Sequence, residues 1–205
     1  MHVTQENWMS ASDEHSTKLW EALIMAGAVI VNVVATAALN QELDLDELGK
    51  FRGILHDSEI YGGRVAYFKT SNMKGKVSLF ASGKMISVGT TSEKEAFHEL
   101  EYVKEFLVEK GFTKPIRLQP KIRNMVVTAD FGESVDLEEL SKNCKMIYEP
   151  EQFPGGILKI EEPYKITVLI FASGKAVIPG LRSSSQIKPI IQKLTNVIKA
   201  YRQSR

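Results

Sequence analysis

The chain lacks several features that would narrow its function quickly. It contains a single cysteine, Cys144, so no disulfide can form within the chain, which fits a reducing compartment. Its charges nearly cancel, with 26 Lys and Arg against 25 Asp and Glu, and this balance argues against disorder and against a strongly basic nucleic-acid-binding arm. With 205 residues, 43% of them hydrophobic, the chain suits one domain or two small ones with a substantial core.

Patterns of catalysis and metal binding are also missing from the sequence. The four histidines do not have the spacing of metal ligands. Gly62-Gly63 and Gly155-Gly156 are expected in turns and lack the following Lys-Ser/Thr of a phosphate-binding loop. Cys144 has no neighbouring His or Asn that would activate its thiol. We therefore expect no enzyme activity, no metal and no cofactor.

One apolar run, Ala22–Leu39, has the length of a membrane span. An acidic segment precedes it, and Asn32 and Thr36 lie within it. Its second half is rich in β-branched Val and Ile, which favours a strand. We expect a strand here and no membrane association.

The sequence contains a direct repeat. A shift of 92 positions places Val29–Leu48 on Lys121–Leu140 with nine of twenty residues identical. With one further residue lost, Phe80–Lys84 falls on Phe171–Lys175, and all five residues are identical. We predict an extension at 1–28, a first repeat at 29–112, a linker at 113–120 and a second repeat at 121–205. Residues 1–27 have no counterpart and are expected to be mobile or weakly helical.

Each repeat predicts the same order of elements: a strand, a short helix, several short strands and a long helix. Asp44 and Asp136 are expected to cap the short helices, and Ser92 with Glu95 is expected to form a capping box on the first long helix. The Ser-Gly-Lys within each repeat predicts a tight hairpin turn. Pro189 is expected to mark a late start or a kink in the second long helix.

The first strand of each repeat is apolar or small at both alternating sets of positions. Neither residues 31–37 nor residues 125–129 place Lys or Glu on the face that should be solvated. Two helices per repeat cover only one face of such a sheet. The second face is therefore buried against another part of the chain, used for oligomerisation, or presented to a ligand.

Two segments of the second repeat resemble a known family. Tyr148–Gly155 (YEPEQFPG) and Leu169–Lys175 (LIFASGK) are similar to the second-half signature of the TATA-box-binding protein family, and the likeness extends over about residues 29–201. The resemblance implies an α+β fold, a pseudo-twofold saddle in which one curved antiparallel sheet of about ten strands carries four helices on its convex face. It also implies a general transcription initiation factor that binds and bends AT-rich promoter DNA through the minor groove. The similar stretches look more archaeal than animal-like.

The resemblance assigns the DNA contacts residue by residue. The side chains that intercalate between base steps are Tyr61, Phe80, Phe153 and Phe171. Those that contact the minor groove are Asn32, Val34, Asn124 and Val126. Those that contact phosphates are Arg64, Lys84, Lys159, Lys175 and Arg182.

The resemblance also implies partners. A transcription factor IIB-like protein is expected on the second-half stirrup around Glu149, Glu151 and Gln152, followed by the RNA polymerase machinery. The concave face is a possible dimer interface when DNA is absent. The expected location is intracellular and associated with DNA, in the cytoplasm or nucleoid of an archaeon or in a eukaryotic nucleus.

The first repeat departs from the family pattern more than the second. Tyr61-Gly62-Gly63 stands where the second repeat has Phe153-Pro154-Gly155, and the hairpin around residues 70–75 is about two residues longer than usual. Val88–Thr91 and Pro179–Arg182 replace the usual Thr-Gly-Ala-Lys. These departures leave an alternative open, in which the chain is a divergent paralogue that acts mainly as a protein-interaction or regulatory subunit with weak or no bending of TATA DNA.

Charge is also unequal between the repeats. Residues 29–112 carry 10 basic and 12 acidic side chains, whereas residues 116–205 carry 14 and 9. We therefore expect the second repeat to anchor the chain on phosphates, with affinity that falls as salt rises. Glu at Lys175 and Arg182 is expected to weaken binding more than Glu at Lys84.

Overall fold

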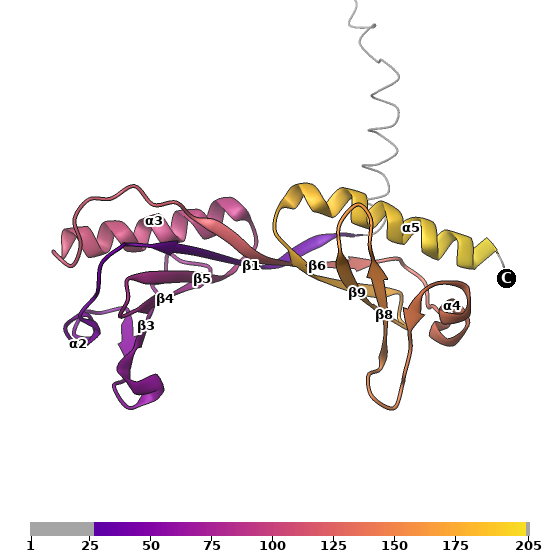
Figure 1. Cartoon of the computed structure of the whole chain (residues 1–205), viewed down its shortest axis with the longest axis horizontal. Coiled ribbons are helices and arrows are strands. Elements are labelled where there is room, and N and C mark those ends of the chain that lie inside the picture. Colours follow the sequence, from indigo (N-terminus) through magenta and orange to yellow (C-terminus); the bar gives the residue numbers. More distant parts are fainter. Residues whose placement is uncertain (1–26, 204–205) are drawn as a thin grey trace, which may run out of the picture. The chain divides into compact units, whose positions relative to one another are not determined.

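A computed structural model describes residues 27–203, apart from the side chains of Ile60 and Tyr61 (Figure 1). The expectation for residues 1–27 lies almost wholly outside the described residues. The first repeat forms β1 (Val29–Ala38), α2 (Leu45–Leu48), β2 (Ile54–His56), the 3-10 helix η1 (Ile60–Gly63), β3 (Val65–Phe68), β4 (Lys76–Phe80), β5 (Lys84–Thr90) and α3 (Glu93–Glu109). The second forms β6 (Lys121–Asp130), α4 (Leu137–Asn143), β7 (Met146–Ile147), β8 (Gly155–Ile160), β9 (Ile166–Phe171), β10 (Lys175–Leu181), the 3-10 helix η2 (Ser184–Gln186) and α5 (Ile187–Gln203).

The ten described strands form one sheet in the order β2-β3-β4-β5-β1-β6-β10-β9-β8-β7. Each half of this order mirrors the other, as a direct repeat requires. The predicted α+β class, the repeated unit, the antiparallel sheet and its four helices are confirmed. The sequence did not place the edge strands β2 and β7, which have only three and two residues.

The described residues divide into two compact units that differ from the two repeats. The first unit comprises residues 30–127 and 179–184, and the second comprises residues 128–178 and 185–203 together with the described residues before Ile30. The first unit therefore contains the linker, most of β6 and the end of β10. The predicted domain boundaries of the repeats remain a prediction.

In the first unit α3 packs on β4 and β5 (Figure 1). The helix begins after Ser92, whose Oγ accepts a hydrogen bond from the backbone N–H of Glu95 at 3.2 Å. The carboxylate of Glu95 accepts from Thr91 and pairs with Lys74, and the hydrogen bond from Lys74 lowers the pKa of Glu95 to about 2. One side of the helix packs on the sheet through Leu100, Val103 and Leu107, which are fully buried.

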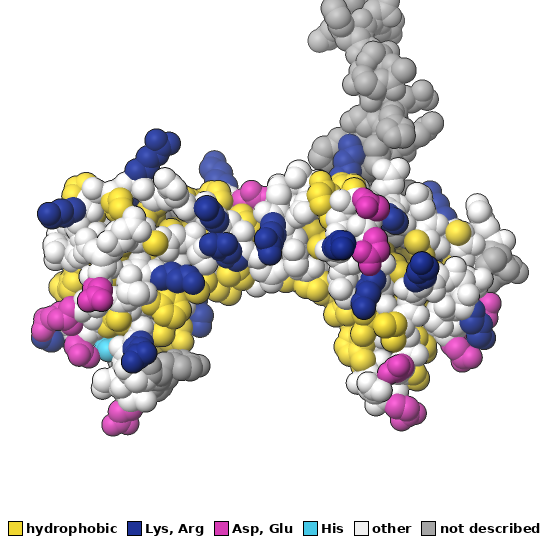
Figure 2. All heavy atoms as spheres, viewed as in Figure 1, with side chains coloured by type: hydrophobic (Ala, Val, Ile, Leu, Met, Phe, Trp, Pro, Cys, Tyr) yellow, Lys and Arg dark blue, Asp and Glu magenta, His cyan; other side chains and the backbone are white. Residues whose placement is uncertain are grey.

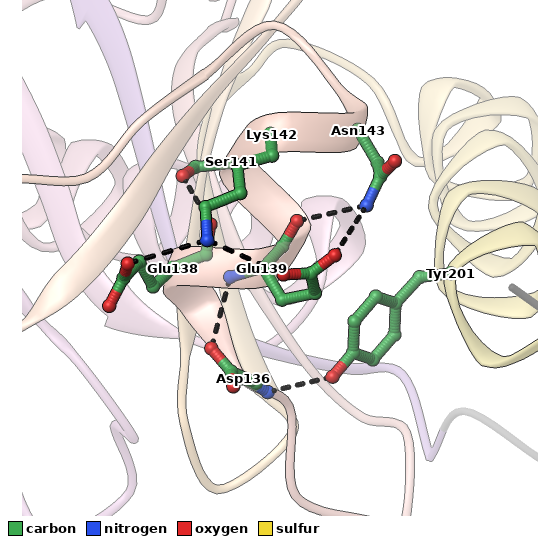
Figure 3. A network of polar contacts seen from close by, with 7 residues as sticks. All are labelled: Asp136, Glu138, Glu139, Ser141, Lys142, Asn143 and Tyr201. Atoms are coloured by element: carbon green, nitrogen blue, oxygen red, sulfur yellow. Dashed lines mark hydrogen bonds and ion pairs between the residues drawn. The ribbon is translucent and has the colours of Figure 1, made fainter. Parts of the chain in front are cut away.

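In the second unit a hydrogen bond connects the start of α4 to the last turns of α5 (Figure 3). Asp136 caps α4 as predicted, because its Oδ1 accepts from the backbone N–H of Glu139 at 3.0 Å. The backbone N–H of Asp136 donates to the hydroxyl of Tyr201 in α5 at 3.1 Å, and Tyr201 is only 2% exposed. Pro189 lies in the first turn of α5 directly after η2, where a missing backbone N–H breaks no helical hydrogen bond.

The two Ser-Gly-Lys turns have the predicted geometry. Gly83 has φ +78° and Gly174 has φ +81°. A Cβ on Gly83 would lie 1.9 Å from the carbonyl oxygen of Gln41, and one on Gly174 would lie 2.0 Å from that of Glu133. Both positions therefore require glycine for conformation and for space.

Candidate nucleic-acid interface

The sheet of the first unit has one face covered by α3 and one face that no described helix covers. Side chains on the covered face, such as Val33 and Ala35 of β1, are fully buried, and those at alternate positions are half-buried or exposed, apart from Thr36, which is 8% exposed. We call the second set the open face of the first unit; it includes Asn32, Val34, Thr36, Leu55, Val65, Tyr67, Lys76, Ser78, Phe80, Ile86 and Val88. Figure 2 shows hydrophobic side chains gathered on the side of each unit away from its long helix. Because part of this apolar face is exposed, it is available to a ligand or to a second copy of the chain.

Two asparagines of the first unit are held in the same way. Oδ1 of Asn32 accepts from the backbone N–H of Gly89 at 3.0 Å, and Oδ1 of Asn124 accepts from that of Gly180 at 2.8 Å. No described residue accepts a hydrogen bond from either Nδ2, so both amides keep two free donors. The edges of A·T pairs offer only acceptors in the minor groove, which matches these donors. Val34 and Val126 lie half-buried two positions further along the same strands.

A bulge in β5 explains why Asn32 is fixed. Val33 pairs with Thr90 and Val34 pairs with Val88, so Gly89 is an extra residue on β5. The N–H of the extra residue has no partner in the strand ladder, and the side chain of Asn32 accepts from it instead. The backbone itself therefore orients the amide toward the open face.

In the second unit two of the predicted intercalating side chains lie side by side. The ring centroids of Phe153 and Phe171 are 5.9 Å apart with an interplanar angle of 61°, and both rings are half-buried. Gly155 pairs with Phe171 across β8 and β9, and a Cβ there would lie 2.7 Å from the ring of Phe153 and 3.2 Å from that of Phe171. The two rings therefore leave no room for a side chain at Gly155, the last residue of the Phe-Pro-Gly segment.

The first unit lacks a matching arrangement among its described side chains. Phe80 is half-buried and pairs with Val65, whereas Tyr61 lies in the 3-10 helix η1 and its side chain is outside the described residues. Gly63, the counterpart of Gly155, ends this 3-10 helix with φ +68°, and a Cβ there would lie 3.4 Å from Ser58, whereas Gly155 begins the strand β8. The predicted departure at Tyr61-Gly62-Gly63 therefore includes the backbone, and the pairing of Tyr61 with Phe80 stays a prediction.

The predicted phosphate contacts are all exposed but are spread over both units. The first unit contains Arg64, Lys84 and Arg182, and the second contains Lys159 and Lys175. The first unit carries 15 Lys and Arg against 12 Asp and Glu, whereas residues 128–178 with 185–205 carry 10 against 9. The excess of positive charge in the second repeat therefore belongs largely to the first unit, because the linker and the start of β6 fold with it.

Sequence reasoning missed the exposed apolar residues of the two edge strands and the aromatic ring that pairs with one of them. Leu55 and Ile147 lie on the edge strands β2 and β7, 92 positions apart, with 69% and 47% of their surface exposed. Tyr67, which pairs with Leu55, carries the ammonium group of Lys76 at 4.6 Å from its ring centroid. The repeat shift applied to residues 54–56 would have revealed the matched apolar edges.

The predicted stirrup residues lie in a tight turn. The carbonyl oxygen of Glu149 accepts from the backbone N–H groups of Gln152 and Phe153 at 2.9 and 3.0 Å. The side chains of Glu149, Glu151 and Gln152 are exposed. The same turn thus presents two carboxylates and begins the segment that carries Phe153.

Other kinds of site find little support in the described part of the chain. Among these residues no group of three His, Cys, Asp or Glu could hold a metal ion. None of the described helices has the length and apolar character needed to cross a membrane. Cys144 is half-buried, and burial raises the pKa of its thiol, which is unfavourable for a nucleophile.

Comparison with known proteins identifies the same family as the sequence motifs. The model of the family described as "Transcription factor TFIID (or TATA-binding protein, TBP)" matches residues 28–109 and 119–201. The TATA-box-binding protein of Cenarchaeum symbiosum is 38% identical over 160 residues, which cover 78% of this chain and 87% of that protein. The TATA-box-binding protein of Methanococcus aeolicus is 34% identical over 174 residues, which cover 83% of this chain and 93% of that protein.

A solved structure agrees with these relatives. The Methanococcus jannaschii TBP has a TM-score of 0.73 and 32% identity, and the match covers 84% of this chain and 98% of that one. The family model is matched twice, once by each repeat, as the internal shift of 92 positions predicts. This is a family of transcription factors and not of enzymes. On its repeated sequence, its ten-stranded sheet and these matches, the chain belongs to the TATA-box-binding protein family.

Proposed function

We propose that this chain is a general transcription initiation factor that binds AT-rich promoter DNA in the minor groove and bends it. The observation that carries the proposal is the pair of asparagine amides, each fixed through Oδ1 and each presenting its Nδ2 donors beside a half-buried valine. Such donors suit a groove whose A·T pairs present only acceptors, and apolar neighbours tolerate close packing against sugars and base edges.

Bending is assigned to the aromatic side chains. Phe153 and Phe171 supply two adjacent rings at one point of the surface, and Phe80 supplies a third ring in the first unit. Inserted rings unstack a base step and kink the duplex, at a cost of a few kcal/mol that extra contacts offset. Tyr61 keeps a flat ring but adds a hydroxyl that must remain hydrated or find a partner.

Recruitment of a partner protein is assigned to the turn around Glu149 and Glu151 in the second unit. Glu149 and Glu151 are exposed in a turn whose backbone has two internal hydrogen bonds, so the turn offers two carboxylates to a basic partner. We assign this surface to a transcription factor IIB-like protein that in turn brings in RNA polymerase. With this function the protein is located inside the cell and associated with DNA.

A bending assay tests the proposal directly. A duplex with an AT-rich centre carries a donor and an acceptor dye at its ends, and energy transfer is measured with and without a IIB-like partner. We expect transfer to rise on addition of the chain and to rise further with the partner. A duplex with a G·C-rich centre is the control, because the N2 amino group of G opposes the asparagine donors.

The alternative of a divergent paralogue that does not bend DNA makes the opposite prediction. It rests on Tyr61, Val88, Thr91 and Pro179, whereas the intact Phe153–Phe171 pair and both asparagines oppose it. If energy transfer does not rise even with the partner present, the bending function is contradicted and the divergent-paralogue alternative remains.

A further inference from the structure

A basic cleft lies in the first unit, where the end of β1, the β4–β5 turn, the linker and the start of β6 meet. Its volume is about 410 Å³, a size typical of ligand sites. Four cationic side chains line it: Lys84, Arg117, Lys121 and Arg123. Hydroxyl and amide groups complete the polar lining at Thr36, Asn40, Ser82 and Gln119. No Asp or Glu is part of this lining, so the chemistry of the cleft is that of an anion site.

The positive charge of the cleft is not neutralised within the described part of the chain. None of its four cationic side chains forms an ion pair with a carboxylate of residues 27–203. Like charges held close together repel each other, and an anion that binds among them removes this cost. An unneutralised cluster around a hollow is therefore an arrangement that favours a bound anion.

The lining is held in place by the fold. Nε of Arg123 donates to Oγ1 of Thr36 at 2.8 Å, and Thr36 is only 8% exposed. No described residue accepts a hydrogen bond from the two Nη groups of Arg123, and a guanidinium group suits two-pronged contact with phosphate oxygens. On the opposite side, the carbonyl oxygen of Gly83 accepts from the backbone N–H of Leu39 at 2.9 Å, which fixes the turn that carries Lys84.

The cleft is not a product of the repeat. The shift of 92 positions places Arg117, Lys121 and Arg123 on Met25, Val29 and Val31. Val29 and Val31 are exposed valines, with 56% and 44% of their surface accessible. Of the four cationic positions of the cleft, the repeat therefore reproduces that of Lys84 alone, as Lys175.

We propose that this cleft binds a phosphate group, and that the group is a backbone phosphate of the DNA bound by the open face. This assignment rests on the proposed function and names four residues as one phosphate site, where the sequence indicated Lys84 alone. Phosphate is favoured over a peptide carboxylate because the lining combines two guanidinium groups with hydroxyl and amide donors, which together reach several oxygens of one tetrahedral group.

The test compares two double variants that lose the same charge. Arg117→Gln with Lys121→Gln removes two exposed cations of the cleft, and Lys94→Gln with Lys110→Gln removes two cations of the same unit from α3 and its C-terminal end. Binding of an AT-rich duplex is titrated at several KCl concentrations. We expect the cleft variant to bind on the order of tenfold more weakly and its log–log salt slope to fall by about 0.9, the value for one lost phosphate contact. The α3 variant is expected to stay within about twofold of the wild-type chain.

A second measurement separates the sources of phosphate. Inorganic phosphate is titrated into the wild-type chain without DNA, and the amide resonances of Ser82 and Gly83 are followed by NMR. Phosphate-dependent shifts that vanish in the cleft variant support the site whatever the DNA result. If the salt slope is unchanged in that variant, the ligand is a free phosphate compound instead of the DNA backbone.

Two outcomes distinguish this proposal from the proposed function. A wild-type chain that fails to bend DNA but shows the phosphate-dependent shifts loses the proposed function and keeps the site. A wild-type chain that bends DNA, with equal salt slopes in both double variants and no response to phosphate, keeps the function and loses the site. Unfolding temperatures of both variants within about 2 °C of wild type show that the comparison concerns binding.

Discussion

The two aromatic regions of this protein come from copies of one sequence but differ in structure. In the second unit Phe153 and Phe171 contact each other around Gly155, which has room for no side chain. In the first, Phe80 stands on β4 and the segment of Tyr61 forms a 3-10 helix with Gly63 beside Ser58. The two sequence repeats thus share their asparagines and turns and differ in the part assigned to kinking DNA. The second unit is expected to provide the stronger kink.

The largest expected effect follows from removing one ring in each unit. Phe171→Ala should weaken binding to an AT-rich duplex by roughly 10- to 100-fold, because one stacked ring contributes about 1–3 kcal/mol. Phe80→Ala should cost less, since its ring has no described aromatic neighbour. Energy transfer and affinity are measured together for both variants. Equal losses would show that the two units kink DNA equally and would contradict the comparison.

The two asparagines should respond alike, in contrast to the rings. Asn32→Asp and Asn124→Asp keep an oxygen that accepts from Gly89 or Gly180 but replace the donating amide with a negative oxygen. Each change should therefore leave the unfolding temperature within a few degrees and reduce DNA affinity by about tenfold or more, an estimate based on one lost groove contact of 1–3 kcal/mol. Asn→Ala at the same sites is the matched comparison, because it also removes the acceptor and should lower stability. A large fall in unfolding temperature for the Asp variants would show that the amides are structural.

These contrasts also show what a sequence alone predicts. The repeat, the Asp caps, the Ser-Gly-Lys turns and the parity of the strands depend on local spacing, so all of them were visible in the sequence. The environment of Gly155 and the two asparagine contacts depend on strand register and on a bulge at Gly89, which spacing does not specify. The edge strands escaped notice because two or three residues show no alternation.

The sequence alone did not show which part of the folded protein carries the excess of positive charge. Counting by repeat assigns the positive excess to the second copy, because Arg117, Lys121 and Arg123 follow the first copy in the chain. The structure assigns them to the first unit and brings them to Lys84. Long-range packing of the linker decides this, and linker packing has no local signal.

The position of these cations changes which of two charge reversals, Lys84→Glu or Lys175→Glu, is expected to weaken DNA binding more. The charge count by repeat predicts that Glu at Lys175 and Arg182 weakens binding more than Glu at Lys84. With three further cations around Lys84, we now expect Lys84→Glu to cost the larger factor, severalfold more than Lys175→Glu at low salt. The measurement is a DNA titration at low and high KCl. A larger loss for Lys175→Glu would restore the sequence-based order and weaken the case for the cleft.

A milder substitution examines the first-unit ring directly. Tyr61→Phe removes the hydroxyl that distinguishes this position from Phe153 and should raise the bending signal by up to about twofold, because an inserted ring no longer needs to keep a hydroxyl hydrated. Phe153→Tyr is the reciprocal change and should lower the signal by a similar factor. If neither variant changes energy transfer, the difference between the units lies in the backbone around Gly63 and not in the hydroxyl.

The smallest effect on DNA binding, with a clear effect on stability, is expected from a contact that only the first unit has. Glu99 on α3 is 5% exposed; its carboxylate accepts from the backbone N–H of Gly75 at 2.7 Å and from the hydroxyl of Ser87 at 3.1 Å. It thereby connects the long 70–75 hairpin to the helix. A shift of 91 or 92 positions places isoleucines, Ile190 and Ile191, at the corresponding sites of α5.

Glu99→Ala leaves both donors buried without an acceptor and should lower the free energy of unfolding by about 1–3 kcal/mol. Glu99→Gln keeps one acceptor and should cost less, and urea denaturation of both variants measures the difference. An unchanged midpoint in Glu99→Ala would mean that the hairpin is held by Lys69, whose ammonium group donates to the carbonyl oxygens of Met73, Lys74 and Gly75, and that the first unit does not depend on this contact.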